Sequence, residues 1–282
     1  MIETATHVVF REGRQLSGSS FGPLDGRAVL FIAGAATGKS MHFGHELLYA
    51  ARVRLLTMDR PGMGGSTVDV DRTLQSTVDD YRTFVQGALG SSALRIPVVA
   101  NSQGSVFGLS AAVAGWASRL VLVSPADEVS FPPISAMLPV GVTQLARLAS
   151  VDPDAAQEVL SAFDASAMEA MVLGGASEND RSVYTSPDFL ALYRRALHEG
   201  FANSGSGYVR DTLIAMRPWD LPLGDIDCPV RVLFGAEDLG HSPDHAVILA
   251  DRIPTARRDV IGDAGGALLW THAARVLESL DD

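Results

Sequence analysis

The sequence predicts an α/β fold in which a mostly parallel sheet is flanked by helices. Short apolar runs bounded by turn residues recur along the 282-residue chain, and segments with helical periodicity separate them. This alternation is typical of parallel strands joined by helical crossovers. The interval of residues 126–217 contains helical patterns but no convincing strand, so we expect a helical insertion there.

The pattern predicts a sheet of eight strands. Residues 6–10 and 14–22 indicate an opening hairpin, and later apolar runs indicate strands at 28–34, 52–59, 95–101, 118–125, 228–235 and 256–262. Helical patterns predict helices at 40–51, 74–89, 105–115, 243–252 and 267–280. We therefore predict a core made of residues 1–125 and 218–282, with residues 126–217 forming a helical lid.

The composition and charge argue against several kinds of partner. A net charge of −11 opposes binding to nucleic acid or to an anionic membrane surface. The N-terminus lacks the basic and apolar regions of a signal peptide, and no apolar run approaches the ~20 residues of a membrane span. Cys228 is the single cysteine, which excludes an internal disulfide and suits the cytoplasm. A small-molecule substrate is expected, with no cofactor and no metal ion.

The strongest indication of a site is the segment VVANSQGSVFG, which contains Ser102. A buried strand is expected to lead directly into small residues around this serine, and a helical pattern follows it. This arrangement is typical of a nucleophile elbow, a strained strand-to-helix turn that raises the serine hydroxyl out of the sheet. The N-terminal amides of the following helix would favour negative charge that develops beside the serine.

Two other segments match known motifs less convincingly. Residues 18–22 fit the pattern G-x-S-x-G literally, but they have no buried strand before them and are predicted to form a turn. The segment AGAATGKS at residues 33–40 fits a loose form of a phosphate-binding loop, with Lys39 and Ser40 at its end. The first glycine of that motif is displaced by one position, so nucleotide binding is a remote alternative.

The second of these segments fits another role better. A glycine-rich loop after the third strand can supply one backbone amide of an oxyanion hole, and the residue after the nucleophile supplies the other. Ala35 and Gln103 would occupy these two positions. Near the C-terminal end, the run VLFGAED places Asp238 after a strand, where a carboxylate could orient a catalytic histidine.

With these features in chain order, the sequence resembles the α/β-hydrolase superfamily over nearly its whole length. The resemblance rests on the Ala33-Gly34 turn, the segment DRPGMGGS, the serine elbow, the insertion and the segment DCPVRVLFGAED. It implies an α/β-hydrolase fold, with Gly34 beside the oxyanion hole. Asn101 precedes the nucleophile, as in carbon–carbon bond hydrolases and esterases of the group. The resemblance also places the catalytic histidine at position 266, where this chain has Gly266.

Four other histidines are candidates for a replacement base. His272 lies six residues beyond Gly266, about 9 Å further along a helix and near its opposite face, which makes it unsuitable. His241 is the nearest candidate, because it follows Asp238 in a loop that borders the site in this family. His42 and His45, after the oxyanion loop, are further candidates.

The glycine at position 266 leaves four interpretations open. The protein could be an enzyme with non-hydrolytic chemistry such as cyclisation or elimination, a hydrolase with a relocated base, an engineered inactive hydrolase, or a ligand-binding protein. The intact elbow, the oxyanion loop and Asp238 favour an enzyme. The expected substrate is a small apolar ester, thioester, lactone or ketone, because methionines in the insertion can line adaptable apolar sites, although packing of the lid also explains them: Met137, Met168, Met171 and Met216.

Overall fold

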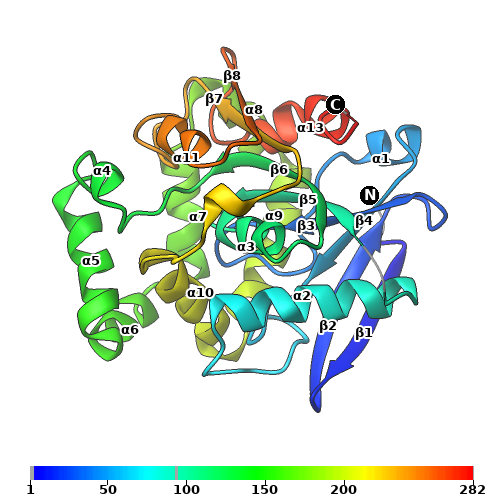
Figure 1. The fold of residues 1–282 in the computed structure, drawn as a ribbon, viewed down its shortest axis with the longest axis horizontal. Coiled ribbons are helices and arrows are strands. Elements are labelled where there is room, and N and C mark those ends of the chain that lie inside the picture. The colour runs from blue at the N-terminus through cyan, green and yellow to red at the C-terminus, as the bar shows by residue number, and fades with distance from the viewer. Residues whose placement is uncertain (1–2, 93–94, 282) are drawn as a thin grey trace.

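The computed structural model describes residues 3–92 and 95–281 and is built around an eight-stranded sheet (Figure 1). The strands follow the order β1-β2-β4-β3-β5-β6-β7-β8. Each lies where the sequence predicts one. Their bounds are β1 Ala5–Arg11, β2 Arg14–Phe21, β3 Arg27–Ile32, β4 Val53–Met58, β5 Ile96–Ser102, β6 Ala117–Pro125, β7 Val230–Gly235 and β8 Ala256–Ile261.

The pairing of the strands makes the sheet mostly parallel, as predicted. β1 and β2 form the expected antiparallel hairpin, and β2 also pairs antiparallel with β4. Every other neighbouring pair is parallel. The predicted turn at residues 18–22 is wrong, because residues 18–21 belong to β2 and pair with β4. The hairpin predicted over residues 14–22 is the correct interpretation of this segment, and Gly18 leaves room for the ring of Phe84.

Hydrophobic clusters cover both faces of the sheet. One face is covered by α2 (Leu74–Leu89), α3 (Ser105–Val113) and α11 (Val247–Asp251). The other is covered by α1 (Glu46–Ala50), α12 (Leu268–Thr271), α13 (Ala273–Glu278) and helices of the insertion. Because both faces are buried, the central strands are apolar throughout, and this makes them easy to find in the sequence.

The helices agree less closely with the prediction. α2 spans the predicted residues, but the helix expected at 40–51 forms only from Glu46. Ser40 donates its backbone N–H and its hydroxyl to Glu199, and His45 has a φ of +39°, so the chain between them leaves the helical path. The helix expected at 243–252 begins only at Val247, and the one expected at 267–280 is divided at His272.

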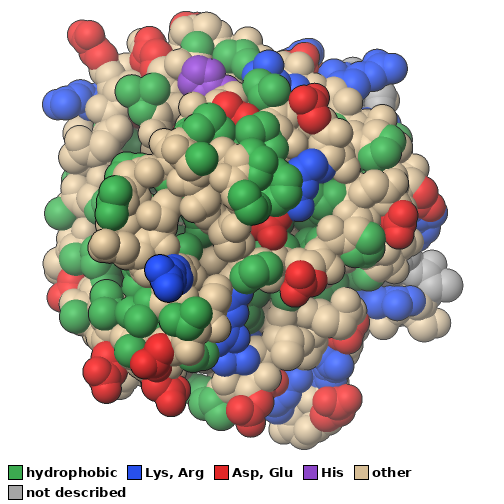
Figure 2. Space-filling model, turned by 60° about the vertical axis from the view of Figure 1, so that its left-hand side comes forward, with side chains coloured by type: hydrophobic (Ala, Val, Ile, Leu, Met, Phe, Trp, Pro, Cys, Tyr) green, Lys and Arg blue, Asp and Glu red, His purple; other side chains and the backbone are tan. Residues whose placement is uncertain are grey.

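Residues 126–217, here called the insertion, contain helices and connecting segments but no strand, as predicted. Side chains from these helices line a cavity together with residues at the carboxyl ends of β3, β5 and β7. Hydrophobic side chains also gather on the outer face that contains these helices (Figure 2), with Val140 and Val151 each 70% exposed. The helices are α4 Pro132–Ser135, α5 Val140–Val151, α6 Pro153–Ser161, α7 Ala165–Gly174, α8 Glu178–Tyr184, α9 Pro187–Gly200 and α10 Ser206–Met216, with a 3₁₀ turn at Asn203–Gly205.

No helix in the described part of the chain combines the length and the hydrophobicity needed to cross a membrane. Within the same residues, no group of three or more His, Cys, Asp or Glu side chains is arranged to hold a metal ion. Cys228 is buried at the start of β7, where burial raises the pKa of its thiol. Its surroundings therefore disfavour the reactive thiolate.

Candidate active site

Ser102 ends β5 in a sharp turn that leads into α3. Its φ is +52°, a left-handed conformation that costs a non-glycine residue free energy and often marks a functional position. The turn is possible because Gly104 has no side chain: a Cβ there would lie 2.5 Å from the Ile32 carbonyl oxygen and 2.6 Å from that of Ala33. The backbone therefore has the strained geometry expected of a nucleophile elbow.

The loop after β3 lies directly against this turn. A Cβ at Gly34 would come within 3.2 Å of the Ser102 Cβ, so glycine lets the loop approach the serine. Arg60 holds the loop in place by donating to the carbonyl oxygens of Ala33, at 2.9 Å, and of Gly34, at 2.8 Å. In the described part of the chain the backbone N–H groups of Ala35 and Gln103 make no hydrogen bond. They are free to receive a substrate oxygen.

Arg60 is itself part of a buried ionic network that the sequence analysis missed. The carboxylate of Asp211, on α10, pairs with both Arg60 and Arg72, and all three side chains are almost fully buried. Arg60 also donates to the Tyr81 hydroxyl at 3.3 Å. The sequence offers the segment DRPGMGGS only as part of the family resemblance. Its arginine links the insertion to the oxyanion loop, and the partner of that arginine lies 151 residues further along the chain.

His241 forms the clearest acid–base pair of the site. Its Nδ1 lies 2.9 Å and 3.0 Å from the two carboxylate oxygens of Asp238, which is 3% exposed. One oxygen of Asp238 also accepts the backbone N–H of Gly240 at 3.1 Å. These contacts fix the orientation of the carboxylate. Nε2 of His241 makes no hydrogen bond within the described residues, and the ring lines the same cavity as Ser102.

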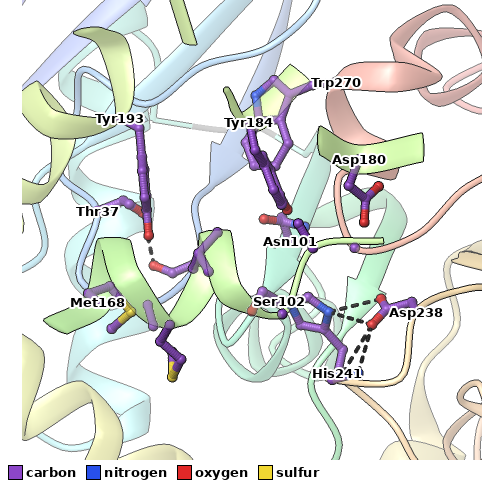
Figure 3. Close-up of a pocket in the computed structure, with 18 of the residues that line it drawn as sticks. Thr37, Asn101, Ser102, Met168, Asp180, Tyr184, Tyr193, Asp238, His241 and Trp270 are labelled. Carbon is purple, nitrogen blue, oxygen red and sulfur yellow. Dashed lines mark hydrogen bonds and ion pairs between the residues drawn. The ribbon is translucent and has the colours of Figure 1, made fainter. Parts of the chain in front are cut away.

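Two consecutive residues after β6 hold the serine and the histidine near one another. The backbone N–H of Ala126 donates to the carbonyl oxygen of Ser102 at 3.1 Å, and that of Asp127 donates to the carbonyl oxygen of His241 at 3.3 Å. Since neighbouring Cα atoms are only about 3.8 Å apart, both backbones are fixed at the same place. In Figure 3 the His241 ring lies between Ser102 and Asp238.

Position 266 lies beside the ring of His241. A Cβ on Gly266 would be 3.2 Å from Cε1 of His241, which is tighter than ordinary van der Waals contact, and 3.5 Å from Nδ1. The neighbouring Gly265 leaves room for Ser177 and for Asp180 of α8, and the carboxylate of Asp180 accepts the backbone N–H of Ala267 at 3.0 Å. Gly265 therefore leaves room for side chains of the insertion, and Gly266 leaves room for the ring of His241.

The charges of the site shift the pKa values of this pair in opposite directions. Burial alone lowers the pKa of His241, but the charge and hydrogen bonds of Asp238 and the charge of Asp180 outweigh it and raise the pKa above 6.5. Burial alone raises the pKa of Asp238, but His241 and the N–H of Gly240 outweigh it and lower the pKa below 3.8. The carboxylate is thus ionised at neutral pH, and the imidazole is a stronger base than usual.

The cavity measures about 310 Å³ and lies between the insertion and the carboxyl ends of the strands (Figure 3). This volume is at the lower end of the range for small-molecule sites. Ser102, Asp238, His241 and Gly266 line it together with Gly34, Ala35 and Asn101 of the predicted set. Two of the four methionines considered in the insertion are also lining residues, Met168 and Met171.

Several residues that the sequence predicts for the site have side chains that contact the rest of the fold. Asn101 donates its side-chain amide to the Val123 carbonyl oxygen at 2.9 Å and so supports β6, while the side chain of Gln103 contacts Thr212. His42 stacks on Phe21, and burial lowers its pKa to about 4. Neither His42 nor His45 is among the residues that line the cavity, and the same holds for His272, which contacts Asp263.

The phosphate-loop alternative conflicts with the contacts of its own residues. The backbone N–H and the Nζ of Lys39 each lie 2.7 Å from the carboxylate of Asp59. The backbone N–H and the hydroxyl of Ser40 contact Glu199 at 2.8 Å and 2.5 Å. Carboxylates therefore occupy the donors that would bind a phosphate, which argues against nucleotide binding.

The fold is shared with solved structures at low sequence identity. A bromoperoxidase from Bacillus anthracis matches with a TM-score of 0.74 and 15% identity, covering 99% of this chain and 100% of that one. An enol-lactonase from Burkholderia xenovorans matches with a TM-score of 0.67 and 20% identity, covering 98% of each chain. A structure described as Est816, an N-acyl homoserine lactone degrading enzyme, matches with a TM-score of 0.68 and 19% identity over 98% and 99% of the two chains.

A comparison with curated proteins gives no significant sequence match. The profile of a family described as the alpha/beta hydrolase family matches residues 29–279, which is most of the chain. The match extends from β3 to α13 and includes Ser102, Asp238 and His241. The chain belongs to the alpha/beta hydrolase family of enzymes.

Proposed function

We propose that the protein hydrolyses a small carboxylic ester, thioester or lactone, with Ser102 as nucleophile, His241 as general base and Asp238 as the acid member of the triad. The observation that carries this proposal is the contact of His241 Nδ1 with both oxygens of the buried Asp238 carboxylate. The ring lines the same cavity as Ser102. His241 would thus replace the histidine that the family places at position 266.

The geometry supports a specific sequence of steps. With Nδ1 donating to Asp238, Nε2 of His241 is available to accept the proton of the Ser102 hydroxyl. The serine oxygen bonds to the substrate carbonyl carbon, and the N–H groups of Ala35 and Gln103 stabilise the negative oxygen that results. The imidazolium then gives its proton to the leaving group, and water releases the acyl group from the serine. Ser102 and His241 make no hydrogen bond to each other in the free protein, and such contacts often form only with substrate bound.

The alternatives considered from the sequence all began with the absence of a base at Gly266. These were a non-hydrolytic enzyme, an inactive variant and a ligand-binding protein. His241 offers a base whose ring lies beside that position, so Gly266 no longer favours them. An ester or lactone bond is further supported by two similar structures that are described as lactone-degrading or lactonase enzymes. We also propose that the insertion acts as a lid and that the protein works in the cytoplasm.

The proposed nucleophile can be tested by covalent labelling. A small alkyl fluorophosphonate is expected to add one phosphonyl group to the protein at Ser102, because only an activated serine attacks such a reagent at neutral pH. The measurement is intact mass followed by peptide mapping, with Ser102→Ala as the variant that should stay unmodified. Ser105→Ala, which alters a buried serine on α3, is the matched control and should still be labelled. A folded protein that takes up no label, or carries it elsewhere, would contradict the assignment of Ser102.

The pH dependence of kcat/KM provides a second prediction. A base must be unprotonated, so activity should fall as the pH decreases through the pKa of His241. Because Asp238 and Asp180 raise that pKa, the midpoint is expected above 6.5. The measurement uses an uncharged ester, whose own protonation state does not change in this range. A midpoint at or below 6.5 would show that His241 is not the group that titrates.

A further inference from the structure

Two tyrosines of the insertion present free hydroxyl groups to the cavity. Tyr184 ends α8 and Tyr193 lies on α9, and their side chains are only 6% and 5% exposed. Both line the cavity that contains Ser102. Within residues 3–92 and 95–281 neither phenol oxygen has a hydrogen-bond partner. Each oxygen borders the open cavity, where a polar atom of a ligand can accept its hydrogen bond.

The ring of Tyr184 is held firmly by its aromatic neighbours. It packs against Phe189 with ring centroids 5.1 Å apart and against Trp270 with centroids 6.1 Å apart. The hydroxyl oxygen lies 3.8 Å from the position that a Cβ on Gly266 would occupy, beside the ring of His241. Tyr184 therefore directs its hydroxyl to the catalytic side of the cavity.

The charged residues around the cavity are all acidic. Asp180, Glu237 and Asp238 line it, and no lysine or arginine is among the described lining residues. Asp180 and Tyr184 are separated by one helical turn on α8 and share its inner face. Burial and the charges of Asp180 and Asp238 raise the pKa of the Tyr184 phenol, which therefore stays protonated and can donate a hydrogen bond. An anionic group in the cavity would meet this acidic wall with no lysine or arginine of the described lining to balance it.

Building on the proposed hydrolysis, we propose that the substrate is an uncharged ester or lactone with a second acceptor oxygen, which accepts a hydrogen bond from Tyr184. Tyr193 provides a further donor at the wall formed by α9. The apolar side chains that line the cavity, among them Met168, Phe189 and Trp270, enclose the hydrocarbon part of the molecule. Tyr184 is thus a specificity-determining residue, and carboxylate-bearing esters are excluded by charge.

The test uses p-nitrophenyl esters of equal length. The reference is the pentanoate, and a series replaces one methylene of its chain, other than the one bonded to the carbonyl carbon, by an ether oxygen, position by position. A second series consists of alkyl acetates. Its reference is pentyl acetate, and an ether oxygen replaces one methylene of the pentyl group. For at least one position, Tyr184→Phe should lower kcat/KM about tenfold relative to the matched hydrocarbon ester, because the lost hydrogen bond leaves the substrate oxygen unpaired. Phenylalanine keeps the ring packing, so hydrolysis of the hydrocarbon ester should change little.

Two further arms complete the design. Tyr49→Phe alters an exposed tyrosine on α1 and should leave the ratio between matched esters unchanged. The wild-type protein should hydrolyse p-nitrophenyl hemisuccinate, which is an anionic analogue of similar length, at least tenfold more slowly than the pentanoate. If the wild type hydrolyses these esters but no oxygen position depends on Tyr184, or if the hemisuccinate is hydrolysed equally well, the inference about the substrate is wrong. Absence of Ser102-dependent hydrolysis in every case would instead overturn the proposed function.

Discussion

Replacing His241 with alanine is expected to lower kcat for ester hydrolysis by about 10⁴- to 10⁶-fold, the range seen when a serine triad loses its base. The imidazole is the group that would take the serine proton, and Asp238 alone cannot reach that role from its position behind the ring. Residual activity should remain, because the N–H groups of Ala35 and Gln103 still stabilise the oxyanion. The measurement is kcat and KM on an activated ester, with circular dichroism to verify folding.

His272→Ala is the matched control for this prediction. His272 follows α12, contacts Asp263 and is not among the cavity-lining residues, so its removal should change kcat less than about twofold on the general expectation for residues remote from the site. Equal losses in both variants would remove the basis for choosing His241. A large loss in His272→Ala alone would mean that His272 is the base.

The same prediction can be tested by placing a histidine at position 266. Gly266→His should not raise activity in the wild type, because its Cβ would lie 3.2 Å from Cε1 of His241 and the two rings would compete for one space. In the His241→Ala background that space is empty. The double variant should then recover part of the lost activity. Gain in the single variant and none in the double variant would contradict a relocated base.

The second large effect is expected on stability. Asp211→Ala would leave Arg60 and Arg72 buried without their shared carboxylate. Removal of one partner from a buried ionic network typically lowers the free energy of unfolding by about 3–5 kcal/mol. The measurement is urea-induced unfolding followed by tryptophan fluorescence. The oxyanion loop should also lose order, since Arg60 donates to the Ala33 and Gly34 carbonyl groups, and Thr37 donates only to the second of them.

Asp227→Ala supplies the comparison for this loss. Asp227 pairs with Arg95 at 3.0 Å, but the two side chains are 67% and 49% exposed, and solvent screens their interaction. Exposed pairs contribute about 0–1 kcal/mol. A similar cost for Asp211→Ala and Asp227→Ala would show that the buried network adds nothing to stability beyond an ordinary surface pair.

The sequence reveals the strands of this protein more completely than its helices, and the reason is physical. Central strands such as β5 are apolar on both faces, so a run of residues records their burial directly. The loop before α1 is shaped instead by the bond of Ser40 to Glu199, 159 residues away, and by the positive φ of His45. Nothing in the local pattern of residues 40–45 could indicate those contacts.

Some parts of the candidate site can likewise be predicted from the sequence, and others cannot. The elbow at Ser102 is encoded by a few adjacent small residues, so the sequence predicts it. The contact of His241 with Asp238 lies within one loop, yet the sequence alone left His241 as one candidate base among several. The choice depends on the direction of the ring, which is set by Gly266 and by the backbone of Asp127. The contact of Arg60 with Asp211 joins distant segments and could not be expected from either one.

The loop after β7 contains both the acid and the proposed base, only three residues apart. An acid–base pair of this kind is a single local unit: any displacement of the loop moves both groups together and preserves their contact. The segment after β8 then supplies no catalytic side chain. Gly265 leaves room for Asp180 of α8, and the backbone N–H of Ala267 donates to the Asp180 carboxylate. Residues 236–242 therefore form one short acid–base segment, whose position depends on the space left by Gly266 and on the backbone N–H of Asp127.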